Sequence, residues 1–251
     1  MRLIDLEHDP KKEGNPIFWK TSCANNRASG LGKGLFISFE GGEGAGKSTQ
    51  IRLLAARLRD YARELVTTRE PGGTALAERL RDVILSGRAK TFGPLGEAVL
   101  FSAARIDHID RLIAPALGRG AVVLCDRFAD STRAYQGARG EIDDTVMAAL
   151  ENATVADCRP DLTFILDIPP EIGLERARAR RGEGTADRFE GEDLSFHWQL
   201  REKFLGIARA DPERCRVIDA DRPQDAVAAS IWEAMAEKFR RREHEAAEGV
   251  S

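Results

Sequence analysis

The chain has 251 residues, of which 42% are hydrophobic and 31% are charged, and its formal net charge is −3. This composition fits one sizeable globular domain, or at most two small ones, and argues against a disordered chain or a broadly basic nucleic-acid-binding protein. No apolar run approaches the roughly 18 residues of a membrane-spanning helix. Thirty of the 38 cationic side chains are arginine, which grips phosphates bidentately, although a GC-rich coding sequence explains the same bias.

Residues 1–33 differ from the rest of the chain. They are rich in Gly, Asn and Pro and show no apolar periodicity, so we expect an irregular N-terminal extension. A single domain is predicted over 34–243, followed by a tail over 244–251. The four cysteines form no C-x-x-C pair, and few cysteines without an apolar signal segment predict a cytoplasmic protein.

From residue 35 onward, short apolar runs alternate with longer stretches of helical spacing. The runs predict strands over Leu35–Glu40, Leu65–Thr68, Ala121–Asp126, Leu162–Asp167 and Arg216–Asp219. Helices are predicted over Ser48–Tyr61, Ala75–Leu85, Leu95–Leu117, Asp143–Ala153, Glu171–Arg181 and Pro223–Arg242. The strands are continuously apolar, as is typical of strands that are covered on both faces. The pattern predicts an α/β fold with a five-stranded parallel sheet flanked by helices.

The first strand runs directly into a glycine-rich loop. Its residues are Gly41, Gly42, Glu43, Gly44, Ala45, Gly46, Lys47, Ser48 and Thr49, which match G-x-x-x-x-G-K-[ST] in full. Glycines let backbone N–H groups converge on phosphate oxygens, and the helix that follows adds partial positive charge. We therefore expect the loop to bind ATP, with Lys47 bridging the β- and γ-phosphates and Ser48 holding Mg²⁺.

Glu43 is an unusual member of this loop because a carboxylate repels phosphate. We expect it to face another group, such as a sugar hydroxyl or an arginine, or else to point into solvent. The sequence alone leaves these possibilities open.

Charged residues follow the next two predicted strands. The second strand ends in Thr68-Arg69-Glu70-Pro71-Gly72-Gly73-Thr74, and the third ends in Asp126-Arg127-Phe128. Ligands of an open parallel sheet bind beyond the carboxyl ends of its strands, so Arg69 and Arg127 should emerge beside the glycine-rich loop. Asp126 is placed to hold a Mg²⁺ water, with a surface Asp–Arg ion pair as the alternative.

Two further segments could add to the same crevice. Phe101 and Arg105 stand four residues apart on one helix face, and residues 131–136 supply hydroxyls and an amide. From physical reasoning alone, Phe101 fits a core position better.

The last candidate is an arginine-rich helix interrupted by glycines. Its arginines, together with one beyond the glycines, are Arg176, Arg178, Arg180, Arg181 and Arg188. The pattern predicts either a mobile lid over about 176–193 or a solvated basic helix. The lid is favoured because the glycine-rich loop contains no arginine, while the charge that develops in phosphoryl transfer needs cations.

Together these motifs closely resemble the bacterial thymidylate kinases. The resemblance rests on Glu43, on the segment 68–74, on Asp126-Arg127-Phe128 and on 131–136, and it covers about residues 35–240. It implies a P-loop nucleoside monophosphate kinase architecture and the phosphorylation of dTMP to dTDP by ATP with Mg²⁺. It further implies a homodimer, and neither a nucleic acid nor a membrane is expected as a partner.

The resemblance also implies roles for individual side chains. Thymine would stack on Phe101 and hydrogen-bond to Arg105, while Glu43 would face the sugar 3′-hydroxyl and Tyr135 would crowd the ribose 2′ position. The full set expected at dTMP is Arg69, Glu70, Arg81, Phe101, Arg105, Arg127, Ser131, Thr132, Tyr135 and Gln136. The set expected to be catalytic is Glu43, Lys47, Arg127, Arg178, Arg180 and Arg181, because this chain resembles the class whose lid supplies an arginine.

Two alternatives remain open at this point. Another P-loop nucleoside or nucleotide kinase would share the loop motif, and a non-catalytic nucleotide sensor would bind ATP without turnover. A GTPase-type switch is disfavoured because the chain has no Asn-Lys-x-Asp segment that would read guanine.

Overall fold

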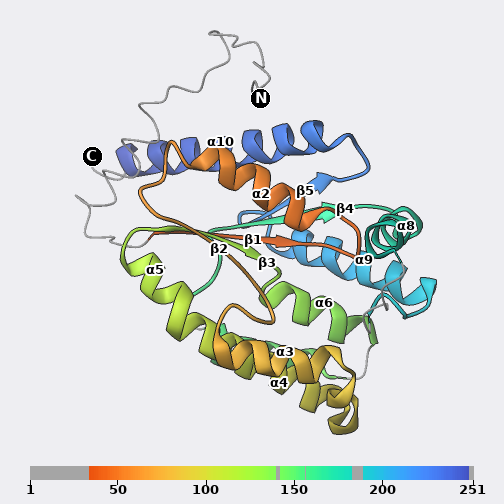
Figure 1. Ribbon diagram of the computed structural model, residues 1–251. Coiled ribbons are helices and arrows are strands. Elements are labelled where there is room, and N and C mark those ends of the chain that lie inside the picture. Colours follow the sequence, from red (N-terminus) through yellow and green to blue (C-terminus); the bar gives the residue numbers. More distant parts are fainter. Residues whose placement is uncertain (1–33, 140–141, 156, 183–188, 249–251) are drawn as a thin grey trace.

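The computed structural model describes residues 34–139, 142–155, 157–182 and 189–248, so the predicted extension 1–33 lies outside the described residues. Its centre is a parallel sheet of five strands with helices on both faces (Figure 1), in which the three inner strands are buried and the two edge strands are partly exposed. The strands are β1 (Leu35–Glu40), β2 (Leu65–Arg69), β3 (Val122–Asp126), β4 (Leu162–Asp167) and β5 (Cys215–Asp219), in the spatial order β2-β3-β1-β4-β5. The predicted fold class is confirmed, and every strand agrees with its prediction to within one residue at each end.

Two helices cover one face of the sheet. They are α2 (Lys47–Leu58) and α10 (Gln224–Glu248), which lie side by side above the strands in Figure 1. Their apolar residues recur at helical spacing and pack on the strands, as Leu54 and Ile231 do against Ile37 and Phe164. The helix α10 continues to Glu248, into the segment 244–251 that the sequence assigned to a tail.

The other face is covered by more helices. A π-helical segment, η2 (Ile109–Ile113), and α5 (Ala114–Gly118) pack on Phe36 and Val123. The helices α6 (Ala129–Arg139) and α9 (Leu194–Ala210) pack beneath Ile165. An outer group follows, consisting of α3 (Ala75–Leu85), the short 3-10 helix η1 (Arg88–Phe92), α4 (Gly93–His108) and α7 (Asp144–Val155).

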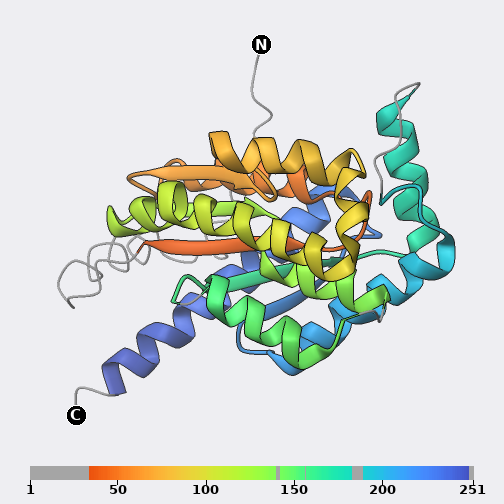
Figure 2. The ribbon, with the colours of Figure 1, turned by 90° about the horizontal axis from the view of Figure 1, so that it is seen from below.

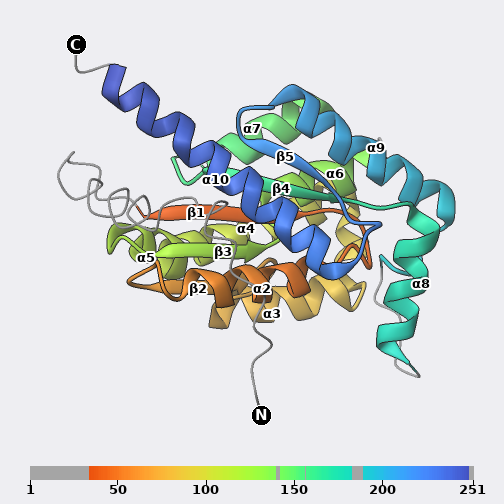
Figure 3. The same ribbon diagram turned by 90° about the horizontal axis from the view of Figure 1, so that it is seen from above.

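The remaining helix, α8 (Pro170–Arg181), stands beyond the carboxyl ends of the strands, as Figure 3 shows from above. The predicted lid, about 176–193, begins within this helix. None of the helices in the described part of the chain is long and apolar enough to cross a membrane.

Three helical regions differ from the sequence prediction. The helix expected over 95–117 is divided, because the π-helical segment η2 separates α4 from α5. The helix α6 was not predicted, since its sequence is mostly polar and contains Gly137. The helix α9 was also missed, although Phe196, Leu200, Phe204 and Ile207 follow a clear helical spacing and are all buried.

Candidate active site

The glycine-rich loop leads from β1 into the first turn of α2. Gly44 and Gly46 have φ of +68° and +88°, a left-handed conformation that glycine adopts readily. A Cβ atom on Gly44 would also lie only 1.8 Å from the carbonyl oxygen of Gly173, so no larger residue fits there. The loop thus turns directly from β1 into α2, with the partial positive charge of the α2 N-terminus beside it.

Lys47 is folded back over this loop. Its Nζ donates to the carbonyl oxygens of Gly41 at 3.0 Å and Gly42 at 2.8 Å. Burial, together with the charge of Arg127, lowers the pKa of Lys47 to about 8. Among the described residues Lys47 is hydrogen-bonded only to neutral carbonyls, which phosphate oxygens can replace.

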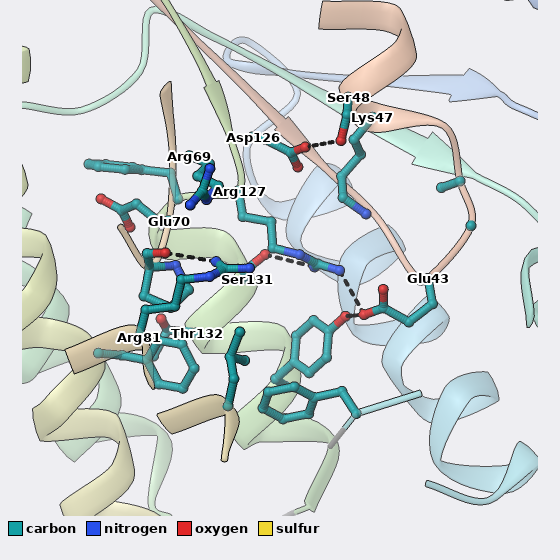
Figure 4. A pocket seen from close by; sticks show the side chains of 18 of the residues that line it. Glu43, Lys47, Ser48, Arg69, Glu70, Arg81, Asp126, Arg127, Ser131 and Thr132 are labelled. Carbon is teal, nitrogen blue, oxygen red and sulfur yellow. Dashed lines mark hydrogen bonds and ion pairs between the residues drawn. The ribbon is translucent and has the colours of Figure 1, made fainter. Parts of the chain in front are cut away.

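Ser48 and Asp126 meet at the edge of the same loop. Ser48 Oγ donates to Asp126 Oδ2 at 2.5 Å, as Figure 4 shows. The two side chains meet because β1 and β3 are parallel neighbours in which Phe39 pairs with Asp126, so both strands end at the same level. A hydroxyl and a carboxylate are the hard oxygen ligands that Mg²⁺ takes, and the pair therefore fits the predicted metal site.

Glu43 points toward an arginine rather than into solvent. Its Oε1 accepts from Arg127 Nη2 at 2.8 Å and from the Tyr135 hydroxyl at 2.6 Å. Burial alone would raise the pKa of Glu43, but Arg127, Lys47 and the Tyr135 hydroxyl outweigh it and hold the pKa at about 2. The carboxylate is therefore ionised at neutral pH, and Arg127 offsets its repulsion of phosphate.

Arg127 has the only positive φ among the described non-glycine residues, at +69°. Such a conformation costs about 1–3 kcal/mol and persists only where the surroundings hold it. Arg127 Nη1 donates to Gly41 O and to Ser131 Oγ, each at 3.2 Å, while Nη2 bonds to Glu43. The guanidinium thus joins the glycine-rich loop to α6, as the dashed contacts in Figure 4 show for Glu43 and Ser131.

Two more of the predicted arginines flank the loop between β2 and α3, because Arg69 is the last residue of β2 and Arg81 lies in α3. Arg69 Nη2 lies 3.0 Å from both carboxylate oxygens of Glu78 and remains half exposed. Arg81 Nη1 donates to the carbonyl oxygen of Pro71 at 2.8 Å, and the Glu70–Pro71 peptide bond is cis. Both side chains line the same cavity as the glycine-rich loop.

Arg105 is held by a buried hydrogen-bonded cluster. Its Nε donates to Glu70 Oε2 at 2.7 Å, and its Nη2 donates to Thr132 Oγ1 at 2.9 Å. His108 Nδ1 lies 3.1 Å from the other Glu70 oxygen and is fully buried. Glu70 was predicted to bind dTMP, and although it lines the cavity its carboxylate is committed to orienting Arg105.

A single cavity of about 360 Å³ unites these groups. One end is formed by residues 43–49 of the glycine-rich loop, and the other end is lined by Phe101, Arg105, Thr132 and Gln136. Asp126, Arg127 and Tyr135 also line the cavity, and Figure 4 shows Asp126 beside Ser48 and Arg127 directed toward Glu43. The structure thus brings all the residues predicted at dTMP into the cavity that also holds the phosphate-binding loop.

A model of the thymidylate kinase family matches residues 39–231 of this chain. The chain belongs to the thymidylate kinase family. It is therefore a P-loop kinase that transfers phosphoryl groups between nucleotides, and the family predicted from the motifs is confirmed.

Named relatives agree with this assignment. The thymidylate kinase of Nitrobacter winogradskyi is 56% identical over 203 residues, which are 81% of this chain and 88% of that relative. The thymidylate kinase of Bradyrhizobium diazoefficiens is 55% identical over 219 residues, or 87% of this chain and 95% of the relative. The crystal structure of thymidylate kinase from Ehrlichia chaffeensis is 33% identical and superposes with a TM-score of 0.66, covering 81% of this chain and 99% of that one.

In this thymidylate kinase family member, the arginines of the predicted lid differ in position. Arg180 lines the cavity and Arg178 does not. Arg181 forms an ion pair with Glu190, Arg180 Nη2 lies 3.6 Å from the same carboxylate, and Arg188 lies outside the described residues. Arg180 is thus the described lid arginine that is placed best to reach bound phosphates.

Arg176 points away from this cavity. Its Nη1 donates to Ala220 O at 2.9 Å, and its Nη2 lies 3.3 Å from Asp221. It therefore joins α8 to the loop that follows β5, and we regard it as a residue of the lid base.

Sequence reasoning missed several residues of the site. Phe189 lines the cavity and stacks edge-on against Tyr135 with ring centroids 4.8 Å apart. His108 and Glu40 are fully buried and contact residues of the site. A signal existed for His108, which stands three residues after Arg105 on the same helix face, whereas Glu40 looked like an ordinary strand end.

Proposed function

We propose that the chain transfers the γ-phosphoryl group of ATP to dTMP and releases dTDP and ADP. The observation that carries this proposal is the single cavity that joins a phosphate-binding loop to an aromatic and arginine-lined end. Its thymidylate kinase relatives, about 55% identical, support the choice of dTMP.

The acceptor end of the cavity suits a pyrimidine deoxynucleotide. Phe101 offers a ring on which a base can stack, while Arg105, Thr132 and Gln136 offer hydrogen bonds to its edge. Arg69 and Arg127 supply two planar guanidinium groups for the dTMP phosphate, with Arg81 beside them.

The chemistry needs positioning and charge more than a strong base. An oxygen of the dTMP phosphate, already anionic, attacks the γ-phosphorus of ATP, and the bond to the β–γ bridging oxygen breaks as ADP leaves. Lys47 exchanges its carbonyl partners for phosphate oxygens, and Arg127 links the two phosphate sites through its contact with Gly41. From the lid, Arg180 supplies charge that stabilises the transferring group.

Ser48 and Asp126 would hold Mg²⁺ at the donor phosphates, Asp126 through a bound water. When bound, Mg²⁺ neutralises phosphate charge in such sites. The 2.5 Å separation of the two oxygens shows that β1 and β3 already bring a hydroxyl and a carboxylate together, which supports this assignment.

We also propose that the protein works as a cytoplasmic homodimer. Five apolar side chains are half exposed on the outer group of helices, namely Leu76, Leu95, Val99, Ile106 and Val146. They come from α3, α4 and α7, of which α3 and α4 lie side by side in Figure 2. Such a patch favours association with a second copy, and sedimentation of the wild type against Val99→Arg tests it.

A coupled assay of ADP release tests the catalytic proposal. With ATP and Mg²⁺ we expect turnover with dTMP, weaker turnover with dUMP, and little with dCMP. A chain that binds ATP but turns over no monophosphate would instead be a nucleotide sensor, and a preference for AMP or thymidine would make it a kinase of different specificity.

A further inference from the structure

Glu40 is a buried carboxylate that the proposed chemistry does not use. It is the last residue of β1, directly before the glycine-rich loop, and its side chain is fully buried. In the described part of the chain it forms no ion pair with Lys or Arg. Instead, Oε1 accepts from the backbone N–H of Phe128 at 2.7 Å, and Oε2 accepts from the Ser131 hydroxyl at 2.5 Å. A buried carboxylate is costly unless it is satisfied in this way, so its retention calls for a reason.

Both partners of Glu40 belong to the turn that presents Arg127. Phe128 directly follows Arg127, whose φ of +69° requires its neighbours to hold the turn. Ser131 Oγ, which donates to Glu40, accepts from Arg127 Nη1 at 3.2 Å. One oxygen of Glu40 therefore holds the backbone directly after Arg127. The other oxygen binds the Ser131 hydroxyl, which in turn binds the guanidinium of Arg127.

The neighbouring contacts lead to the same point. Arg127 N donates to Phe39 O at 2.9 Å, and Arg127 Nη1 donates to Gly41 O at 3.2 Å. The residues on either side of Glu40 thus also bind Arg127. Phe39 and Gly41 thus contact Arg127 directly, and Glu40 between them is linked to it through Ser131.

We propose that Glu40 is a positioning residue that holds Arg127 in register with the glycine-rich loop. The inference rests on the proposed function, in which Arg127 binds the acceptor phosphate while the loop binds the donor. Glu40 directly precedes the loop and is hydrogen-bonded to the turn that contains Arg127. It therefore fixes the position of the acceptor site relative to the donor site. Loss of these hydrogen bonds should lower kcat/KM for dTMP and slow the chemical step, while the affinity for ATP should stay nearly unchanged.

Substitutions of Glu40 test this directly. Glu40→Met keeps the volume but removes both acceptors, and we expect kcat/KM for dTMP to fall roughly 10²-fold, as for misplaced catalytic groups, with KM for ATP within about twofold. Glu40→Gln keeps an acceptor for Phe128 N–H and a hydrogen-bonding partner for Ser131, so it should restore most of the lost activity.

Two further variants keep the test decisive if Glu40→Met folds poorly. Ser131→Ala removes only the link to the guanidinium and should lower kcat/KM for dTMP, and combining it with a Glu40 substitution should add little further loss. Ser38→Ala is the matched control, because it also removes a buried hydroxyl bond on β1, at 2.7 Å to Thr163, but has no contact with Arg127.

The outcomes separate the two proposals. Wild-type chain without activity toward dTMP would overturn the proposed function and this inference with it. An active wild type, with Glu40→Met or Ser131→Ala within about twofold of it in kcat/KM for dTMP, would overturn the positioning role alone. A loss of the same size in Ser38→Ala, or one that raises KM for ATP equally, would also overturn it, since either result indicates general damage to β1 and the loop.

Discussion

The hydroxyl of Tyr135 donates to the Glu43 carboxylate at 2.6 Å, so a side chain of α6 is tied to the glycine-rich loop. The same oxygen, Oε1, accepts from Arg127, while Oε2 has no hydrogen-bond partner among the described residues. Glu43 therefore keeps one oxygen for a substrate hydroxyl and is oriented by its two neighbours. The proposed contact with the sugar 3′-hydroxyl uses this free oxygen.

Substitutions of Tyr135 separate its two proposed roles. Tyr135→Phe loses the bond to Glu43 but keeps the ring, so kcat/KM for dTMP should fall roughly tenfold, as for a hydrogen bond to a charged group. The preference for dTMP over its ribonucleotide counterpart should survive in Tyr135→Phe and decline in Tyr135→Ala, because only the latter removes the bulk near the ribose. Steady-state kinetics with both nucleotides provides the measurement, and an unchanged preference in Tyr135→Ala would contradict the steric role.

The lid arginines differ in their expected effect. Arg180 lines the cavity, and Arg180→Ala should lower kcat by roughly 10³-fold, the effect of removing an arginine that stabilises transferring phosphate. Arg178 lies on the same helix but outside the cavity, so Arg178→Ala is the matched control and should change kcat little. Equal losses in the two variants under saturating substrates would argue against Arg180 as the catalytic arginine.

The ionisation of Glu40 should lower the free energy of unfolding as the pH rises. Burial and the neighbouring Asp130 raise the pKa of Glu40 to about 8, from an ordinary value of 4.5. The groups that face it include Arg127 before α6, Lys47 in the loop and Cys125 on β3. Between these two pKa values, Glu40 holds a proton in the folded chain and has lost it in the unfolded chain. The raised pKa therefore adds to the free energy of unfolding in full below pH 4.5, and this contribution is lost as the pH rises through about 8.

Glu40→Gln removes this dependence because its amide does not titrate. The Tm of the variant minus the Tm of the wild type should therefore increase between about pH 5 and about pH 8.5. Thermal unfolding of both proteins across that range provides the measurement. A difference that stays constant or declines with pH would contradict a raised pKa of Glu40.

Removal of residues 1–32 should leave catalysis intact. The family match begins at residue 39, and the first described backbone bond of the domain joins Gly34 N to Leu117 O. A chain that starts at Lys33 should show kcat and KM values within about twofold of the full-length protein. Lost activity in that shortened, folded chain would assign the N-terminal segment a role in the site.

Much of the fold was predictable because its signals are local. Continuous apolar runs identify the buried strands, and the strand–loop–helix around Lys47 identifies the phosphate-binding loop. The helix α6 was not predictable in this way, because its buried residues include the polar Asp130, Thr132 and Gln136 and therefore form no apolar stripe. The function of Ser131 and Tyr135 thus obscured the helix that carries them.

The contacts inside the site were harder to predict from the sequence. Residues such as Ser48 and Asp126, or Glu40 and Phe128, stand 78 and 88 positions apart and meet only through the register of neighbouring strands. Strand order and register are properties of the whole sheet, and spacing along the chain does not determine them. The sequence therefore predicted which residues gather at the cavity but not which residues hold them there.

Competition among three acceptors tests the proposed reaction. The wild-type chain is incubated with limiting ATP, Mg²⁺ and equal concentrations of dTMP, AMP and thymidine, and the products are separated by chromatography. We expect dTDP as the main product with an equal amount of ADP, and no dTDP from Lys47→Ala, which lacks the loop cation. Consumption of AMP or conversion of thymidine to dTMP in preference to dTDP formation would contradict it.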